Sequence, residues 1–429
     1  MTTAKDTTTI GDYHFLELNE ALLQNPYPFY KQLREQGPVC QEPDYGVYLV
    51  GTLDAIREVN RQPEVFSSIL VANAPYVDLP CPLDETAAYR ASCPFGDKIL
   101  SNDPPDHTRH RKLINRFFTT ARVRQLEPRV RQIVNDVIDT FIDAGEVEFV
   151  TGFAHMVPRL VVGELIGLPE DDQAHFKAFF EDRLHVMAKA AEQPLSGFQQ
   201  RMQNTDGLTE DAFLRNYFVH AIEARRRQPA DDLMSELANA RFEDGELVPL
   251  ESVVSMISLL YAAGGDANTP ELMTNAMLVL LDRPELEEAA RSDPALVKDI
   301  IEEVLRYDTP VPGVFRIALQ DTSVAGVPVP KGGIVMVVYA SANHDEQYFE
   351  DPETFKVDRE FRHPHLGFGL GVHFCPGAPL ARLEGQVAVQ EILRRMTSIR
   401  RLETGPVPYV PSVIQRIPIL LRLGFEQAS

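Results

Sequence analysis

The spacing of apolar and polar residues predicts a chain built mainly from α-helices. Apolar side chains recur at helical intervals in residues 25–36, 123–143 and 157–166. A longer segment, Ser255–Met273, begins with an apolar run that is typical of a buried central helix.

Short strands are predicted between these helices. Residues 46–50 form an expected strand that leads into a helix at 51–60. The segments 314–319, 322–329 and 333–338 are β-rich and punctuated by glycine and proline. The expected fold class is therefore mainly α with small β-sheets, an α+β chain.

No repeat, low-complexity run or Gly/Ser-rich linker divides the sequence. We therefore expect an N-terminal tail at 1–24 and a single domain at 25–429. Two long loops are expected within this domain, at 72–96 and 190–207. Loops of that length in a compact domain are usually lids or binding segments.

Composition narrows the classes of function. The 429 residues carry a formal net charge of −22, which argues against nucleic-acid binding and fits a soluble cytoplasmic protein. The opening residues MTTAKDTTTIGDY lack the apolar centre of a signal peptide. The longest helical apolar run, 253–265, is shorter than the roughly 20 residues that span a bilayer, so we expect no membrane association.

The four cysteines, Cys40, Cys81, Cys93 and Cys375, form no CxxC pair. Their low number favours a reducing compartment. Cys81 and Cys93 each precede a proline, and they are either two loop thiols or a zinc or disulfide pair.

The stretch GFGLGVHFCPG, residues 367–377, carries the strongest chemical signal. Its glycines allow the backbone to approach a flat, bulky group. The helix expected after Pro376 places the sulfur of Cys375 at a helix N-terminus, where a thiolate is favoured. A thiolate on such a surface suits an axial haem ligand. The alternative is a buried structural thiol in a glycine-rich turn.

The central helix contains a second signal, in the sequence AAGGDANTP. Pro270 has no N–H to donate to the carbonyl of Asp266. We therefore expect the helix to open between these residues and to leave carbonyl groups for water or a ligand. The alternative is an ordinary kinked core helix.

The segment DPPDHTRHRKLINRFF predicts a helix with a basic face. His107 and Arg111 are four residues apart and could bind a carboxylate on that face, while Asp103 or Asp106 could cap the helix. The alternative is a solvated basic face.

The segment EEVLR places Glu303 and Arg306 three residues apart on one helical face. Considered alone, they would form a surface ion pair that contributes little to stability.

Together these four stretches resemble one family. FGLGVHFCPG resembles the haem-thiolate signature of the cytochromes P-450, and AGGDAN, EVLR and DPPDHTRHR resemble the family's oxygen-binding, Glu-x-x-Arg and propionate-contacting helices. They occur in the family's order, and the similarity runs from about Asn25 to the C-terminus. The resemblance implies the cytochrome P-450 fold, with haem b held between the central helix and the cysteine loop.

The resemblance also implies roles on the cysteine side of the haem. Cys375 would be the axial ligand and the metal-binding residue, and Phe368 would pack near its sulfur. Pro376 removes one N–H near the sulfur and leaves those of Gly377 and Ala378. The residues expected to hold the haem propionates are His107, Arg111, Arg316 and His373. A buried ion network would join Glu303, Arg306 and Arg359.

On the oxygen side, the expected catalytic positions are Asp266, Ala267 and Asn268. The family usually has a threonine after the acid, and its hydroxyl helps to deliver protons; Ala267 has no hydroxyl. Asp266 is expected to relay protons from solvent. The preferred replacement for the hydroxyl is an ordered water at the Pro270 opening or a hydroxyl of the substrate. Asn268, reached through a distorted helix, is the third candidate.

A hydrophobic substrate would lie against the central helix, the turns near 311–314 and 413–414, and the two long loops. A terpenoid, steroid, aromatic or polyketide-like molecule would fit this lining. The expected contact residues are Leu259, Leu260, Ala263, Gly264, Ala267, Val311, Val314, Val413 and Ile414. Four residues are expected in a mobile roof or, alternatively, in the core: Phe176, Phe179, Leu184 and Met187.

The resemblance implies a monooxygenase that inserts one oxygen atom from O₂ into such a molecule. Electrons would come from a separate acidic ferredoxin with its reductase, docking near Arg109, Lys112 and Arg116; the alternative is that these cations are simply solvated. Two other functions stay open. One is a peroxide-driven or desaturating haem-thiolate enzyme, which Ala267 favours, and the other is a haem-based ligand carrier or sensor.

Overall fold

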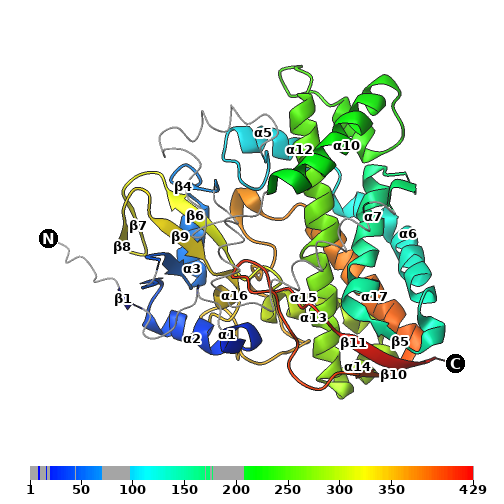
Figure 1. Cartoon of the computed structure of the whole chain (residues 1–429). Coiled ribbons are helices and arrows are strands. Elements are labelled where there is room, and N and C mark those ends of the chain that lie inside the picture. Colours follow the sequence, from blue (N-terminus) through cyan, green and yellow to red (C-terminus); the bar gives the residue numbers. More distant parts are fainter. Residues whose placement is uncertain are drawn as a thin grey trace.

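The computed structural model describes residues 8–9, 16, 20–43, 45–69, 97–169, 171–173, 176 and 207–428, without the side chains of 207–214 and 266. The loop expected at 72–96, with Cys81 and Cys93, lies outside the described residues, as do 190–206. Figure 1 shows the larger sheet and its helices on one side of a long central helix, with most other helices on the opposite side.

The principal helices follow the predicted periodicity. The segment 25–36 forms a helix from Tyr27, with Pro26 at its N-cap position, and 123–143 belongs to a helix that ends at Asp139. Their bounds are α1 (Glu20–Gln24), α2 (Tyr27–Gln36), α3 (Leu53–Asn60), α5 (Asp106–Asn115), α6 (Thr120–Asp139), α7 (Met156–Ile166), α10 (Gly207–Arg227), α11 (Leu233–Ala238), α14 (Pro284–Ser292), α15 (Val297–Tyr307), α16 (Tyr339–Ala342) and α17 (Ala378–Arg395). Shorter 3₁₀ or π turns are η3 (Ile142–Ala144), η4 (Val150–Ala154), η6 (Pro294–Leu296) and η7 (Gly371–His373).

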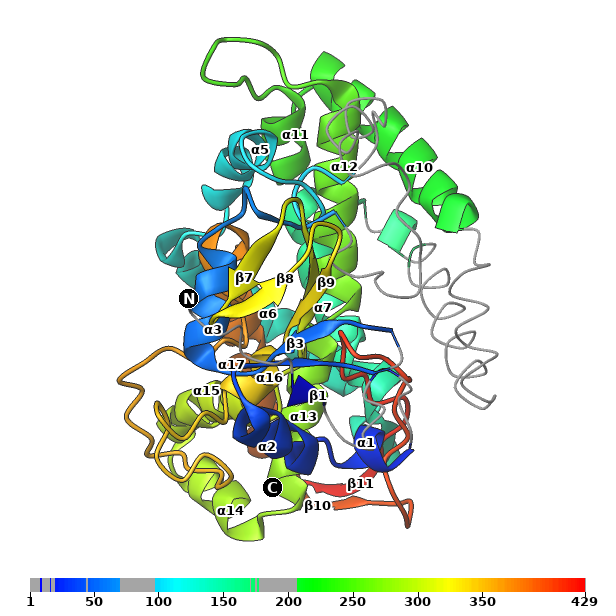
Figure 2. The same cartoon turned by 90° about the vertical axis from the view of Figure 1, so that its left-hand side faces the viewer.

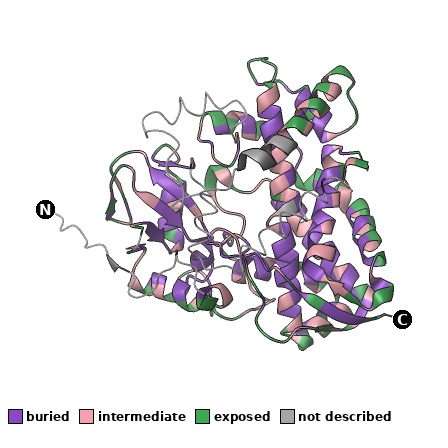
Figure 3. Cartoon of the chain, in the orientation of Figure 1, coloured by how far each residue is buried: buried purple, intermediate pink, exposed green. Residues whose placement is uncertain are grey.

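The central helix is interrupted where the sequence predicted an opening. It consists of α12 (Leu250–Tyr261), the π-helical segment η5 (Ala262–Asp266) and α13 (Thr269–Leu281). The helices α7, α10, α15 and α17 pack along it, as Figures 1 and 2 show. Figure 3 shows how extensively these packed faces are buried. The surrounding helices therefore fix the central helix on both sides of its interruption.

The larger sheet has the strand order β1-β2-β3-β9-β6-β4. Its strands are β1 (Thr8–Thr9), β2 (Val39–Gln41), β3 (Tyr48–Val50), β4 (Phe66–Ser67), β6 (Val314–Ala318) and β9 (Ile334–Val337). β3 runs parallel to β9, with Leu49 opposite Met336, and β6 runs antiparallel to β9, with Arg316 opposite Val335. The predicted strands at 46–50, 314–319 and 333–338 are confirmed.

Two smaller sheets complete the described strands. The segment 322–329 forms the hairpin β7 (Thr322–Val324) and β8 (Val327–Val329). Its two turn residues, Ala325 and Gly326, have φ of 50° and 81°, as a two-residue turn between twisted strands requires. The other sheet joins β10 (Met396–Arg401), β11 (Arg422–Gln427) and β5 (Glu146–Glu148).

The ion network predicted around Glu303 is present and buried. Arg306 Nη2 lies 2.7 Å from Glu303 Oε1, both side chains are fully buried, and Arg359 Nε lies 3.1 Å from the same oxygen. Arg306 Nη1 also donates to the carbonyls of Asn343 and Pro352, each at 2.9 Å. The alternative of a weak surface ion pair is therefore wrong, and the network joins α15 to the chain that follows α16.

Neither expected aspartate caps α5. The N-cap position is Pro105, and no side chain bonds to the first turn. Asp103 instead accepts hydrogen bonds from Ser67 Oγ at 2.5 Å and from the Ser68 N–H at 2.8 Å. The carboxylate of Asp106 accepts one from Asn102 Nδ2 at 2.8 Å. Both aspartates therefore stabilise the turn before the helix.

In the described part of the chain, no helix combines the length and apolarity needed to cross a bilayer.

Candidate functional site

The cysteine loop, residues 367–377, is held by short backbone contacts. The Cys375 N–H donates to the Phe368 carbonyl at 2.9 Å, and the Phe374 N–H donates to the Gly371 carbonyl at 3.0 Å. A Cβ on Gly367 would lie 2.6 Å from the Leu305 carbonyl oxygen. Gly371 has φ of 78°, and its Cβ would lie 2.9 Å from the Asn60 carbonyl oxygen. These two glycines therefore permit close backbone packing inside the protein, whereas we expected them to clear space for a flat ligand.

The sulfur of Cys375 sits at the start of α17, as predicted. Burial raises the pKa of the Cys375 thiol, and hydrogen bonds from the N–H groups of Gly377 and Ala378, with the charge of Arg111, only partly offset that rise. The N–H groups at the start of α17 therefore favour the thiolate, as expected, but burial opposes them. A metal ion on the sulfur would favour the thiolate further.

The four nitrogen-rich side chains expected to bind propionates converge beside this loop. The rings of His107 and His373 have centroids 4.2 Å apart, and Arg111 Nη2 donates to the Phe374 carbonyl. Arg316, on β6, is buried, and its charge helps to lower the pKa of His373. Residues from α5, β6 and the cysteine loop thus meet in one place.

The two histidines of this group are neutral near pH 7. Burial, followed by the charge of Arg111, lowers the pKa of His107 to about 4. Burial, followed by the charge of Arg316, lowers the pKa of His373 to about 2. Arg111 and Arg316 are therefore the permanent cations of the group, beside two histidines whose pKa values are lowered.

This arrangement fits a bound dianion. Both ring nitrogens of His107 are buried and have no hydrogen-bond partner among the described residues. The buried Arg316 guanidinium makes one described hydrogen bond, from Nη1 to the adjacent Phe315 carbonyl at 2.7 Å. Buried polar groups of this kind normally have partners. The two carboxylates of a haem, beside a cysteine sulfur, would supply them.

The opening of the central helix has an unusual backbone. Ala267 is extended, with φ −133° and ψ 146°, and Asn268 has φ 71° and ψ −41°. The Thr269 N–H donates to the Ala267 carbonyl at 3.0 Å, so Ala267–Thr269 forms a γ-turn with positive φ at its centre. The side chain of Asp266 lies outside the described set. The predicted opening is confirmed, and it is a rare turn, not a simple kink.

Some residues expected at the substrate site also take part in packing. The position of a Cβ on Gly264 lies 3.1 Å from Val162 of α7, so this glycine permits two helices to approach. Val413 is buried in a hydrophobic cluster against the larger sheet. Phe176, expected in a mobile roof or in the core, is fully buried, with its ring 5.0 Å from that of Tyr261, which fits the core.

The other expected contacts remain available to a ligand. Ala263 is exposed, and these residues are partly exposed: Leu259, Leu260, Ala267, Val311, Val314 and Ile414. Phe179, Leu184 and Met187 lie outside the described residues. Apolar side chains from the central helix, β6 and the C-terminal turn thus have exposed surface.

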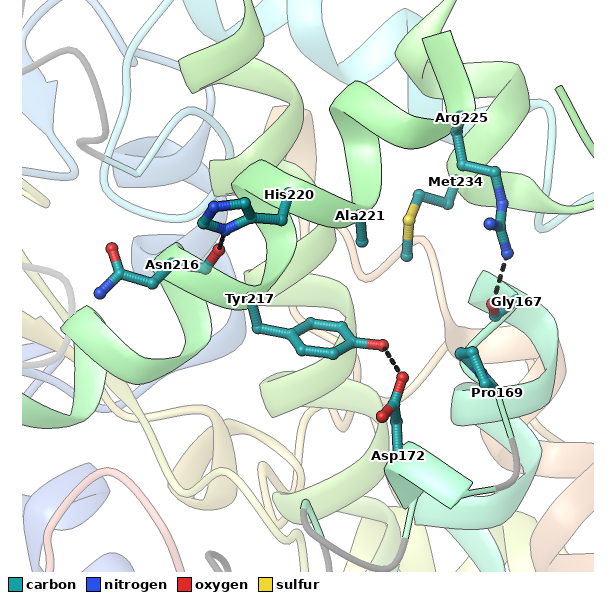
Figure 4. A pocket seen from close by; sticks show the side chains of 9 residues that line it. All are labelled: Gly167, Pro169, Asp172, Asn216, Tyr217, His220, Ala221, Arg225 and Met234. Carbon is teal, nitrogen blue, oxygen red and sulfur yellow. Dashed lines mark hydrogen bonds between the residues drawn. The ribbon is translucent and has the colours of Figure 1, made fainter. Parts of the chain in front are cut away.

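A separate cavity of about 590 Å³ lies between α7, α10 and α11. Figure 4 shows Tyr217 donating to Asp172, at 2.6 Å, on one wall, and Arg225 donating to the Gly167 carbonyl, at 3.1 Å, on another. None of the expected substrate contacts lines this cavity. It is therefore distinct from the site at the cysteine loop.

The basic face of α5 is covered mostly by an acidic turn that no sequence motif predicts there, while Arg116 faces Glu236 of α11. The acidic turn consists of Glu243, Asp244 and Glu246, between α11 and α12. The ion pairs are Arg109–Asp244 at 2.6 Å, Arg109–Glu246 at 3.0 Å, Lys112–Glu243 at 2.8 Å and Arg116–Glu236 at 3.9 Å. The expected docking cations are therefore partnered within the chain, through exposed pairs of the kind that contribute little stability.

Motif reasoning also missed Gln415. This residue lies in the C-terminal turn, and its Nε2 donates to Asn268 Oδ1 at 3.3 Å. No signature marks it, because a contact across 147 residues follows only from the fold.

The chain is also similar to known proteins over most of its length. A family model described as Cytochrome P450 matches residues 61–409. The chain is 33% identical over 386 residues to the vitamin D(3) 25-hydroxylase of Pseudonocardia autotrophica, covering 89% of each chain. It is 33% identical over 305 residues to the 6-deoxyerythronolide B hydroxylase of Saccharopolyspora erythraea, covering 71% of this chain and 72% of that one.

A solved structure gives the same result for the fold. The substrate-free cytochrome P450 CYP150A6 of Mycobacterium marinum superposes with a TM-score of 0.84 at 33% identity, covering 96% of this chain and 98% of that one. The family model spans most of the sequence. The cysteine loop, the opened central helix and the group of His107, Arg111, Arg316 and His373 occur together in one fold. The chain belongs to the cytochrome P450 family of haem-thiolate monooxygenases.

Proposed function

We propose that this monooxygenase inserts one oxygen atom from O₂ into a hydrophobic small molecule of steroid or polyketide type, using electrons from a separate acidic ferredoxin. The observation that carries the proposal is the cluster of His107, Arg111, Arg316 and His373 beside Cys375, in which His107 and Arg316 are buried. Its unpartnered ring nitrogens and buried guanidinium suit the propionates of a haem. Haem b, when bound there, supplies the activation of O₂.

The residues of the chain would divide the remaining tasks. Arg111 and Arg316 would bind the carboxylates as cations, and the neutral histidines would donate to them. Cys375 would ligate the iron as a thiolate, with the N–H groups of Gly377 and Ala378 directed at its sulfur. The carbonyl groups left at the opening of the central helix would hold water close to the substrate.

The substrate class is inferred from the lining and from relatives. The partly exposed side chains around the opening are aliphatic, which suits a largely apolar molecule. The names of two relatives state hydroxylation of a secosteroid, vitamin D(3), and of a macrolide precursor, 6-deoxyerythronolide B. These two names support the choice of class.

A binding screen followed by turnover tests this proposal. Steroids, macrolactones, terpenoids and aromatic acids are added to the haem-loaded protein, and the ferric spin state is followed by absorbance. We expect a low-to-high-spin shift with a steroid or a macrolactone, and a product that has gained one labelled atom from isotopic O₂ when ferredoxin and its reductase are present.

Two outcomes would contradict the proposal. Equal rates with hydrogen peroxide and with the ferredoxin system would favour a peroxide-driven enzyme. A spin shift with no product under any electron supply would favour a ligand carrier or sensor.

The ferredoxin proposal has its own test. Reversing the charges of Arg109, Lys112 and Arg116 to Glu should slow reduction of the ferric protein by an acidic ferredoxin, because steering depends on these cations. Reduction by dithionite, which needs no docking surface, should be unchanged and serves as the control. An unchanged ferredoxin rate would place docking elsewhere on the surface.

A further inference from the structure

We propose that Gln415 is a positioning residue that orients the Asn268 side-chain amide, so that its NH₂ group is the hydrogen-bond donor at the opening of the central helix. The inference rests on the proposed monooxygenase function. It names the group that does the work of the hydroxyl missing at Ala267.

The first step is the backbone of Asn268. A γ-turn with positive φ is strained for a residue other than glycine, and Asn268 adopts one with φ 71° and ψ −41°. Such conformations persist where the surrounding structure holds them, and they cluster at functional sites. The strained turn lies directly after Ala267, at the position where the helix opens.

The second step is the rigid placement of Gln415. Ser412 Oγ accepts hydrogen bonds from the N–H groups of Ile414 and Gln415, at 3.3 and 3.1 Å. On the other side, Arg416 Nε pairs with Asp308 at 2.7 Å, and Nη1 donates to the Leu23 carbonyl at 2.7 Å. The turn is therefore closed by its own hydrogen bonds, and Arg416 ties it to the body of the protein. The side-chain amide of Gln415 extends from this held turn.

The third step is the chemistry of an amide. Gln415 Nε2 donates to Asn268 Oδ1 at 3.3 Å. Because the oxygen of Asn268 is engaged, its NH₂ group is turned away from Gln415. That NH₂ group makes no hydrogen bond to any residue that the structure describes. It is left to donate to a water or to a small ligand.

An amide does not release a proton under these conditions, so Asn268 would orient the water that carries one. The C-terminal turn that positions Gln415 also contains Ile414, an expected substrate contact. A substrate that moves this turn would therefore also move the donor.

The test exploits the difference between an amide and a carboxylate. Ionised glutamate only accepts hydrogen bonds, so Gln415→Glu should force the Asn268 amide to turn over and present its oxygen to the opening. The readout is the infrared stretching frequency of carbon monoxide bound to the reduced, haem-loaded protein without substrate. We expect the frequency to rise in Gln415→Glu and in Asn268→Ala, because both remove the donor.

A double variant separates positioning from a direct charge effect. Gln415→Glu combined with Asn268→Ala should show the frequency of Asn268→Ala alone. The matched control is Gln228→Glu, the same substitution at an exposed position after α10, which should leave the frequency at the wild-type value. Gln415→Leu should broaden the band, because it frees the amide without adding charge.

Two results would overturn the inference: a wild-type frequency in Gln415→Glu, or additive shifts in the double variant. Because carbon monoxide binding requires neither substrate nor ferredoxin, either result stands apart from a failure of the proposed function. With a substrate in hand, Gln415→Glu should also lower the ratio of product to released peroxide by about tenfold, the size expected for losing one hydrogen bond to a developing charge.

Discussion

Asn268 adopts a backbone conformation that residues other than glycine rarely adopt. Asn268→Gly and Asn268→Ala both remove the amide, but only glycine adopts the observed φ of 71° without strain. We therefore expect the free energy of unfolding of Asn268→Gly to be about 1 kcal/mol higher than that of Asn268→Ala. Thermal unfolding at equal haem content measures the difference. Equal stability would show that the turn relaxes once the amide is removed.

His344 is a second residue whose environment predicts a measurable effect. Burial, reinforced by the charge of Arg306 and more weakly by Arg34 and Arg359, lowers the pKa of His344 to about 3. Its Nδ1 lies 2.9 Å from the Ala340 carbonyl, and its ring packs against Tyr27. Because the unfolded chain takes up this proton at about pH 6.5, folding stability falls as the pH drops below that value and levels off near the folded pKa.

We expect the wild type to lose roughly 2 kcal/mol more stability than His344→Gln between about pH 7 and pH 5. Urea unfolding of the two proteins at both pH values gives the difference. The variant itself is the control for every other titrating group, since only His344 differs. Parallel pH profiles would show that the buried ring becomes protonated without opening the structure.

At the scale of elements, the Glu303 network attaches α15 to the chain that follows α16. Glu303→Gln leaves the Arg306 guanidinium buried with a neutral partner. Removing one member of a buried pair typically costs about 3–5 kcal/mol. We expect a loss of this size in the free energy of unfolding, together with easier loss of haem.

The matched control is the exposed pair Arg129–Glu164, with Nη2 and Oε2 2.6 Å apart. Arg129→Leu should cost less than about 1 kcal/mol. Similar losses of unfolding free energy in both variants would mean that the Glu303 network stabilises the protein no more than an exposed ion pair does.

The sequence was most predictive for the secondary-structure elements. Helical periodicity and proline placement predicted α2, α7 and the opening of the central helix, because these features depend on neighbouring residues. The contact made to the γ-turn at Asn268 and the hydrogen bonds to Asp103 before α5 could not be predicted in this way. They depend on Gln415 and on Ser67 and Ser68, which the fold brings from distant parts of the chain.

The candidate site was likewise predicted only in part. The motifs predicted the convergence of His107, Arg111, Arg316 and His373, since each lies at a fixed offset within its segment. The packing of Gly264 against Val162 and of Val413 in a hydrophobic cluster could not be predicted from a pattern, and their contact with substrate stays a prediction. The N–H groups at the helix terminus lower the pKa of Cys375, as expected, but the sequence did not show how strongly burial raises it.

At the scale of the whole molecule, the acidic turn over α5 predicts an effect on electron transfer. An acidic ferredoxin would have to displace Glu243, Asp244 and Glu246 from the cations of α5. Changing all three to amides should raise the rate of reduction by ferredoxin at low salt about tenfold, measured by stopped-flow absorbance.

The control for this experiment changes the same net charge elsewhere. Glu285, Glu288 and Asp299 are exposed on α14 and α15, and their amide variants should raise the rate much less. An equal acceleration in both proteins would show that overall charge, and not the acidic turn, controls docking.

Both ring nitrogens of His107, in the group expected to bind the haem propionates, have no partner among the described residues. This affects the stability of the protein in a cell. Each buried polar group left without a partner costs about 1–3 kcal/mol, and total stabilities are commonly 5–15 kcal/mol. The newly made chain would therefore be less stable until its cofactor arrives. Proteases that remove unfolded chains would then discard the excess, so the steady-state amount of this protein should rise and fall with the supply of haem.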